Sequence, residues 1–148
     1  MPVLTGSSSA EVDAPIDRCW EVVEDVASAP QWQGGLVELE VIERDEQGRP
    51  LICDALSDVK VRKVRTRQRF TYEPPHRLSW KMIEGELDSM DGYWQLEELG
   101  EGRTRATYGL AVDPGRMGLL ARGPFERVAR AIAVNPRAEE LARRVEGR

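Results

Sequence analysis

The chain has 148 residues, a length that suits one domain with a substantial core, and we predict a single domain over residues 1–148. Its net charge of −5 argues against a general nucleic-acid binder, because binding a polyphosphate needs a surplus of basic residues. The two cysteines form no C-x-x-C pair and there is one histidine, so we expect neither a disulfide scaffold nor a metal, and no cofactor is predicted.

The N-terminal part predicts a short strand followed by a helix. Residues 8–13 are the strand, and Pro15 suits the first position of the helix, where its missing N–H has no cost. Residues 28–30 then break the helix, and the glycines at 34–35 permit a sharp change of direction. The helix carries an apolar stripe at helical spacing, made of Ile16, Trp20, Val23 and Val26.

About six runs with the two-residue period of strands follow. They cover residues 37–41, 51–59, 64–72, 78–82, 90–97 and 104–112. The third run has two different faces. One face is basic and the other is polar and apolar, with Arg65, Arg67 and Arg69 alternating with Thr66, Gln68 and Phe70.

The basic face could bind an acidic partner, or its charges could be paired across strands. If the preceding turn closes around residues 61–62, Asp58 would oppose Arg65 and Asp54 would oppose Arg69. Each such pair would contribute roughly 0.2–1 kcal/mol. We therefore interpret this face as the outer, charged surface of a sheet.

The period becomes helical after Pro114. A short helical piece is expected over residues 117–120, and a longer helix from about Phe125 to the C-terminal region. Pro136 lies inside this helix and lacks an N–H, so the helix either kinks there or restarts with Asn135 as its N-cap.

This order predicts an α+β fold, in which one curved antiparallel sheet is closed by a terminal helix and a hollow is left between them. Aromatic and methionine side chains on the inner face are either ordinary core or the wall of a ligand cavity. Inward-facing polar side chains, including Asn135, need a ligand, a water or a backbone partner. The candidate ligand-binding residues are Ser57, Thr66, Gln68, Trp80, Met82, Met90, Trp94, Tyr108, Val128 and Ile132.

Three motifs in order carry a resemblance to a known family. They are V-D-A-P-I-D-R-C-W-E-V-V-E-D-V at residues 12–26, the run at 72–80 and the run at 92–105. The chain resembles the START-like, helix-grip superfamily (SRPBCC), in particular its polyketide cyclase/dehydrase and lipid-transport group. The resemblance implies a seven-stranded sheet wrapped round a long C-terminal helix, with a short helical pair after the first strand. It also implies an apolar cavity for a lipid, a quinone or an aromatic polyketide, and no shared catalytic motif.

Three functions follow as hypotheses. The first is a protein that binds a hydrophobic small molecule. The second is a cyclase or dehydratase, for which Glu84 and Asp88 are the weak candidates for a general acid or base; the same acidic stretch is otherwise a solvated turn. The third is an interaction module without a ligand. Trp32, in the connector before the sheet, either caps a cavity or covers the end of the sheet.

Location and assembly are less constrained. The first nine residues lack a basic region followed by an apolar core, and no apolar run approaches the roughly 20 residues of a membrane span. We therefore expect a cytoplasmic protein with no membrane span, for which transient membrane contact is open. The sequence does not fix the oligomeric state.

Overall fold

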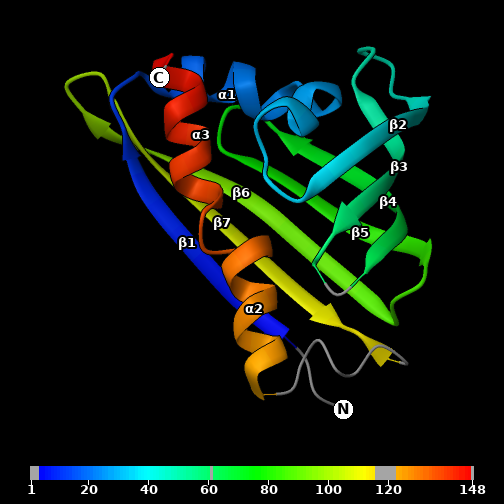
Figure 1. Cartoon of the computed structure of the whole chain (residues 1–148). Coiled ribbons are helices and arrows are strands. Elements are labelled where there is room, and N and C mark those ends of the chain that lie inside the picture. Colours follow the sequence, from blue (N-terminus) through cyan, green and yellow to red (C-terminus); the bar gives the residue numbers. More distant parts are fainter. Residues whose placement is uncertain (1–3, 61, 116–122, 148) are drawn as a thin grey trace.

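Seven strands form one antiparallel sheet in the order β1-β7-β6-β5-β4-β3-β2, so that β1 and β2 are its two edges. The computed structural model describes residues 4–60, 62–115 and 123–147. Figure 1 shows that the sheet curves strongly and that the C-terminal helices lie against its concave side. The strands are β1 (Leu4–Val12), β2 (Leu36–Arg44), β3 (Pro50–Asp58), β4 (Lys63–Glu73), β5 (Arg77–Gly85), β6 (Ser89–Gly100) and β7 (Arg103–Asp113).

The helices are α1 (Ile16–Glu24), the 3₁₀ helix η1 (Val26–Gln31), α2 (Gly123–Ala133) and α3 (Arg137–Glu146). In Figure 1, α3 crosses the sheet near β1 and β7, and α1 lies close to the C-terminal end of α3. The predicted fold class is confirmed: a seven-stranded curved sheet holds a C-terminal helical segment, with a helical pair after the first strand.

Several boundaries differ from the sequence predictions. The first strand begins at Leu4 instead of Ser8, because the whole segment pairs with β7. The predicted break at residues 28–30 is a 3₁₀ helix that includes Pro30. The expected helical piece at 117–120 lies outside the described residues.

The C-terminal helical segment is two helices. Val134 and Asn135 separate α2 from α3, and Pro136 occupies the cap position of α3. The prediction of Asn135 as N-cap is wrong, because the Asn135 N–H donates to the carbonyl of Arg130 at 2.8 Å and so closes α2. This break places Arg137 in the first turn of α3.

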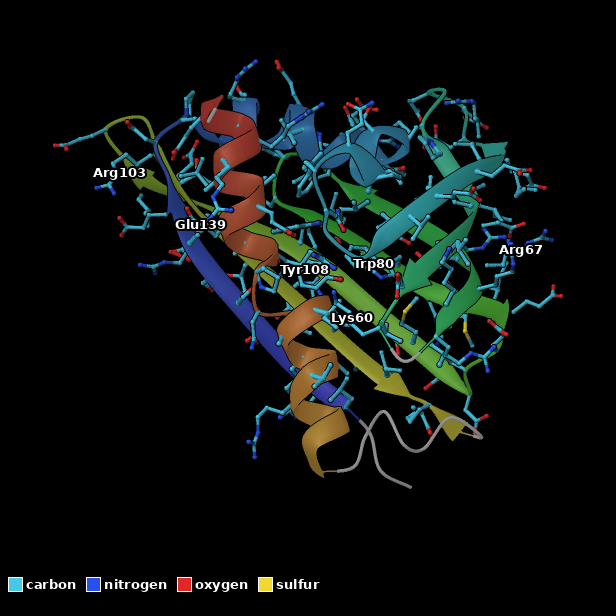
Figure 2. All side chains as sticks on the ribbon, in the orientation of Figure 1. Lys60, Arg67, Trp80, Arg103, Tyr108 and Glu139 are labelled. Carbon is cyan, nitrogen blue, oxygen red and sulfur yellow. The ribbon has the colours of Figure 1, made fainter. Side chains whose placement is uncertain are left out.

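The two faces of the sheet follow the predicted alternation. In β4, Thr66, Gln68 and Phe70 are buried, whereas Arg65 and Arg69 are exposed. The strand therefore turns its arginines outward, and Figure 2 shows Arg67 on the outer side of the sheet.

The predicted pairing of charges is shifted by two residues. Asp54 opposes Arg67 and Asp58 opposes Lys63, and an Asp54 carboxylate oxygen lies 2.7 Å from Arg67 Nε. The turn closes with a hydrogen bond from the Val59 N–H to the Arg62 carbonyl, one residue earlier than the prediction assumed.

The edge of the sheet that β2 forms is less regular. The register between edge strand β2 and β3 shifts at three places, at 36/38, 41/43 and 43/44. No helix among the described residues is long and apolar enough to cross a membrane.

Candidate functional site

A cavity of about 150 Å³ lies between the concave face of the sheet and the helices. Most of its wall is aliphatic or aromatic, from η1, β2 to β7 and α2. The volume is smaller than the roughly 300–1,000 Å³ of pockets for drug-sized ligands, but an apolar cavity of about 150 Å³ is large enough to hold benzene. The space therefore suits a one-ring molecule without rearrangement of the wall.

A row of five aromatic rings lines the cavity. Figure 2 shows Tyr108 beside the connection between α2 and α3, with Trp80 next to it on the side of β2. Neighbouring ring centroids are 4.9–6.0 Å apart, within the range of favourable aromatic pairs. The row runs Phe70, Trp80, Tyr108, Trp94, Trp32.

The sequence provides space for one of these rings. Gly92 in β6 pairs with Trp80 in β5, and a Cβ atom on Gly92 would lie 2.3 Å from the Trp80 indole. The indole thus lies directly over the glycine. Because Gly92 has no side chain, the Trp80 indole can lie against β6 and form this part of the cavity wall.

Eight of the ten candidate ligand-binding residues line the cavity. These are Ser57, Thr66, Gln68, Trp80, Met90, Trp94, Tyr108 and Ile132. Val128 does not, and this residue is 44% exposed, because α2 turns Ala129, Ile132 and Ala133 toward the cavity instead. Met82 does not line it either, and its sulfur lies beside Gly85.

The polar groups of the inner face are partly satisfied by one another. Gln68 Nε2 donates to Thr66 Oγ1 at 2.8 Å, and both side chains are buried. Asn135, predicted to face inward, is exposed in the connection between α2 and α3. Thr66 and Gln68 therefore form one polar spot on a mostly apolar wall.

Arg137 is the charged residue that the sequence analysis missed. It is 4% exposed, lines the cavity and holds its guanidinium 5.9 Å from the Tyr108 ring centroid. Its Nη1 donates to Glu140 Oε1 at 2.6 Å and its Nη2 to the Ile132 carbonyl at 3.1 Å. Burial raises the pKa of the Tyr108 phenol, and the positive charge of Arg137 acts against this rise.

The same network reaches the connector before β2. Glu140 Oε2 accepts a hydrogen bond from the Gly34 N–H at 3.0 Å. A Cβ on Gly34 would lie 2.8 Å from this oxygen, so the close approach depends on glycine. Trp32, two residues earlier, lines the cavity and contacts Trp94. Glu140 thus joins the connector to α3 beside the cavity.

The structure places the candidate acids outside the cavity. Glu84 and Asp88 are both exposed and neither lines it. Asp58 is the one carboxylate among the described lining residues, and its Oδ1 accepts a hydrogen bond from the Lys60 N–H at 2.9 Å. Cys53 is fully buried, and burial raises the pKa of its thiol to about 11.

Comparisons with solved structures support the fold. A START superfamily protein from Mycobacterium smegmatis aligns with a TM-score of 0.82 and 19% identity, over 97% of each chain. A protein from Thermus thermophilus gives 0.81 and 19% identity, over 99% of this chain and 98% of that one. The Zhui aromatase/cyclase from a Streptomyces species gives 0.75 and 18% identity, over 97% of this chain and 94% of that one.

No curated protein matches the sequence. The model of the family described as "Polyketide cyclase / dehydrase and lipid transport" matches residues 12–135, most of the chain. Structural neighbours and family model agree on the START-like architecture that the sequence motifs indicated. The chain belongs to the polyketide cyclase/dehydrase and lipid transport family.

Proposed function

We propose that this protein binds a hydrophobic small molecule in the cavity between its sheet and its C-terminal helices. The observation that carries the proposal is the row of aromatic rings along a mostly apolar space between the sheet and the helices. An empty cavity lowers the stability of the folded protein, because the atoms of its wall lose packing partners. A ligand that fills the space restores those contacts.

The volume limits the ligand. A one-ring molecule or a slim chain fits the cavity of about 150 Å³ as it stands. A larger lipid, quinone or aromatic polyketide would require wall residues to move. Trp32 and Gly35 both lie in the connector and line the cavity, so a shift of this segment would enlarge it.

The two alternatives have less support. A cyclase or dehydratase needs a group that moves a proton at the ligand, and the sequence candidates Glu84 and Asp88 are exposed outside the cavity. An interaction module would have a filled interior, whereas this interior contains a cavity. The single domain over residues 1–148, the cytoplasmic location and transient membrane contact stay predictions.

The first test is native mass spectrometry of the freshly purified protein, followed by organic extraction of whatever is bound. We expect a defined small hydrophobic molecule in the native protein. Ala133→Phe should abolish its retention, because Ala133 lines the cavity. Ala131→Phe is the matched control, since Ala131 is on the same helix but exposed.

Equal retention by the two variants would contradict the proposed place of binding. If no molecule is found, titration with cumene (isopropylbenzene), a one-ring hydrocarbon, replaces the extraction. Failure of cumene to bind the wild-type protein would overturn the proposed function.

A further inference from the structure

The outer face of the sheet carries a second hollow, a groove of about 800 Å³ on the side opposite the apolar cavity. The groove crosses β4, β5, β6, β7 and β1, which are five neighbouring strands of the sheet. Neighbouring strands lie about 4.8 Å apart, so the groove is about 19 Å long. Its side chains come from the alternate positions that point away from the cavity.

Small residues leave room for the groove. Ser7, Gly109 and Ala111 line its part on β1 and β7, and Ser79 lines it on β5. The ring of Tyr93 lies directly over Gly109, because a Cβ atom on this glycine would be 2.1 Å from the ring. The tyrosine therefore lies down on the sheet instead of standing out from it, which keeps the groove open.

The groove contains more positive than negative charge. Its described lining includes the cations Arg69, Arg77 and Lys81 and one carboxylate, Asp91, which lies opposite Lys81 in the β5–β6 ladder. Among the described residues, none of the three cations forms an ion pair with a carboxylate. The whole chain has a net charge of −5, so the groove is a positive site on a negative molecule.

The guanidinium of Arg77 is already ordered by neutral partners. It lies 4.4 Å from the centroid of the Tyr93 ring, and its Nη1 donates to Gln95 Oε1 at 2.9 Å. A guanidinium can bind a carboxylate through two parallel N–H donors, and one that is held in place loses little freedom when it does so. Arg77 is therefore suited to bind a carboxylate from outside the protein.

The shape of the groove favours a short peptide as its occupant. A small-molecule pocket encloses most of its ligand, whereas this groove is open, with exposed side chains at Ser7, Arg69 and Lys81. An extended peptide advances about 3.3 Å per residue, so about six residues would fill the groove. A nucleic acid would extend beyond it and meet exposed carboxylates on the same strands, including Glu73 and Glu84.

We propose that this groove binds an acidic peptide segment of a partner protein, in an extended conformation and about six residues long. Carboxylates of the segment contact Arg77, Lys81 and Arg69, and its backbone lies over the small residues of β1 and β7. The inference goes beyond the proposed function, because it concerns the face of the sheet opposite the ligand cavity.

The structure also changes which residues form the basic face. The sequence placed that face on the arginines of β4 alone, but Arg67 is paired with Asp54. The cations without such a partner in the groove come from β4 and β5 together.

The test is fluorescence anisotropy with three labelled probes and the full chain. In the first peptide glutamate alternates with serine over six residues, in the second glutamine replaces glutamate, and the third probe is a single-stranded DNA of six nucleotides. We expect the glutamate peptide to bind about tenfold more tightly than the glutamine peptide in dilute buffer. Added salt should reduce this difference, because it screens exposed charges.

Two double variants show whether the groove is the binding site. Arg77→Gln with Lys81→Gln removes two cations of the groove and should weaken the glutamate peptide about fivefold. Arg65→Gln with Arg67→Gln is the matched control, because it removes the same charge from the outer face of β4 but outside the groove. The control should weaken the peptide less than about twofold. Thermal unfolding checks that both variants fold.

The outcomes keep this inference separate from the proposed function. Equal binding of the two peptides, or binding of neither, would overturn it. Equal weakening by the two double variants would show that overall charge, and not the groove, attracts the peptide. Tighter binding of the DNA than of the glutamate peptide would refute the assignment of a peptide occupant. Cumene binding tests the cavity independently, and neither double variant should change it.

Discussion

Replacing Gly92 with alanine should disturb the cavity, and Gly109→Ala provides a closely matched control. Each glycine lies in a strand under an aromatic ring. A Cβ on Gly92 would be 2.3 Å from the Trp80 indole, and a Cβ on Gly109 would be 2.1 Å from the Tyr93 ring. Ordinary carbon contacts are about 3.5–4.0 Å, so either ring must move by more than an ångström. Only Trp80 lines the cavity.

We expect both variants to lose about 1–3 kcal/mol of unfolding free energy through overpacking. For a chain of this size that corresponds to a decrease in Tm of roughly 2–4 °C per kcal/mol. Binding should separate them. Gly92→Ala should displace the Trp80 indole into the cavity of about 150 Å³ and weaken the binding of cumene at least tenfold. Gly109→Ala should leave the binding of cumene unchanged.

Thermal unfolding and a cumene titration on both variants measure these effects. Equal affinity of Gly92→Ala and wild type, with the expected loss of stability, would refute the assignment of Trp80 to the ligand-contacting wall. A cumene affinity reduced equally in both variants would show that general destabilisation, and not the cavity, controls binding.

Three further predictions concern stability. Leu141→Ala should lower the free energy of unfolding in urea by about 2–5 kcal/mol, because Leu141 is fully buried. Arg143 on the same helix is exposed, so Arg143→Ala should change it by no more than about 0.5 kcal/mol. The folded state holds the Cys53 thiol neutral, so the free energy of unfolding should fall as the pH rises from 9.0 to about 11. The fall should be smaller in Cys53→Ala, and unfolding measured across this pH range tests the prediction. Asp54→Asn should cost less than about 1 kcal/mol, because its ion pair with Arg67 is half-exposed, and a larger loss in urea unfolding would contradict this view.

The sequence predicted the faces of the strands well. The side chains of a strand alternate between its two faces, so the order Arg65, Thr66, Arg67, Gln68 was enough to assign an outer and an inner side. Most candidate ligand contacts on the sheet follow from this rule. Their pairing partners were harder to predict, because a change of one residue in a turn shifts every opposed pair by two.

The sequence could not identify Arg137, and it left open whether Trp32 caps the cavity or covers the end of the sheet. An arginine in an amphipathic helix normally faces water, and nothing in the pattern of α3 marks Arg137 as buried. Its place depends on the break between α2 and α3 together with the position of Glu140. The nearest signal was Pro136, which indicated a disturbance of the helix but not its direction. Val128 was misplaced for the same reason, since the rotation of α2 depends on where it ends.

The irregular edge strand β2 has a consequence for how copies of this protein meet. An unpaired edge can recruit the edge of another sheet and start aggregation. Here the register shifts along β2 interrupt a flat edge, and Glu38, Glu40 and Glu43 are exposed along it. Two such edges brought together would face like charges. Salt would screen that repulsion over about 10 Å at 0.1 M, so self-association through β2 should be weakest in dilute buffer.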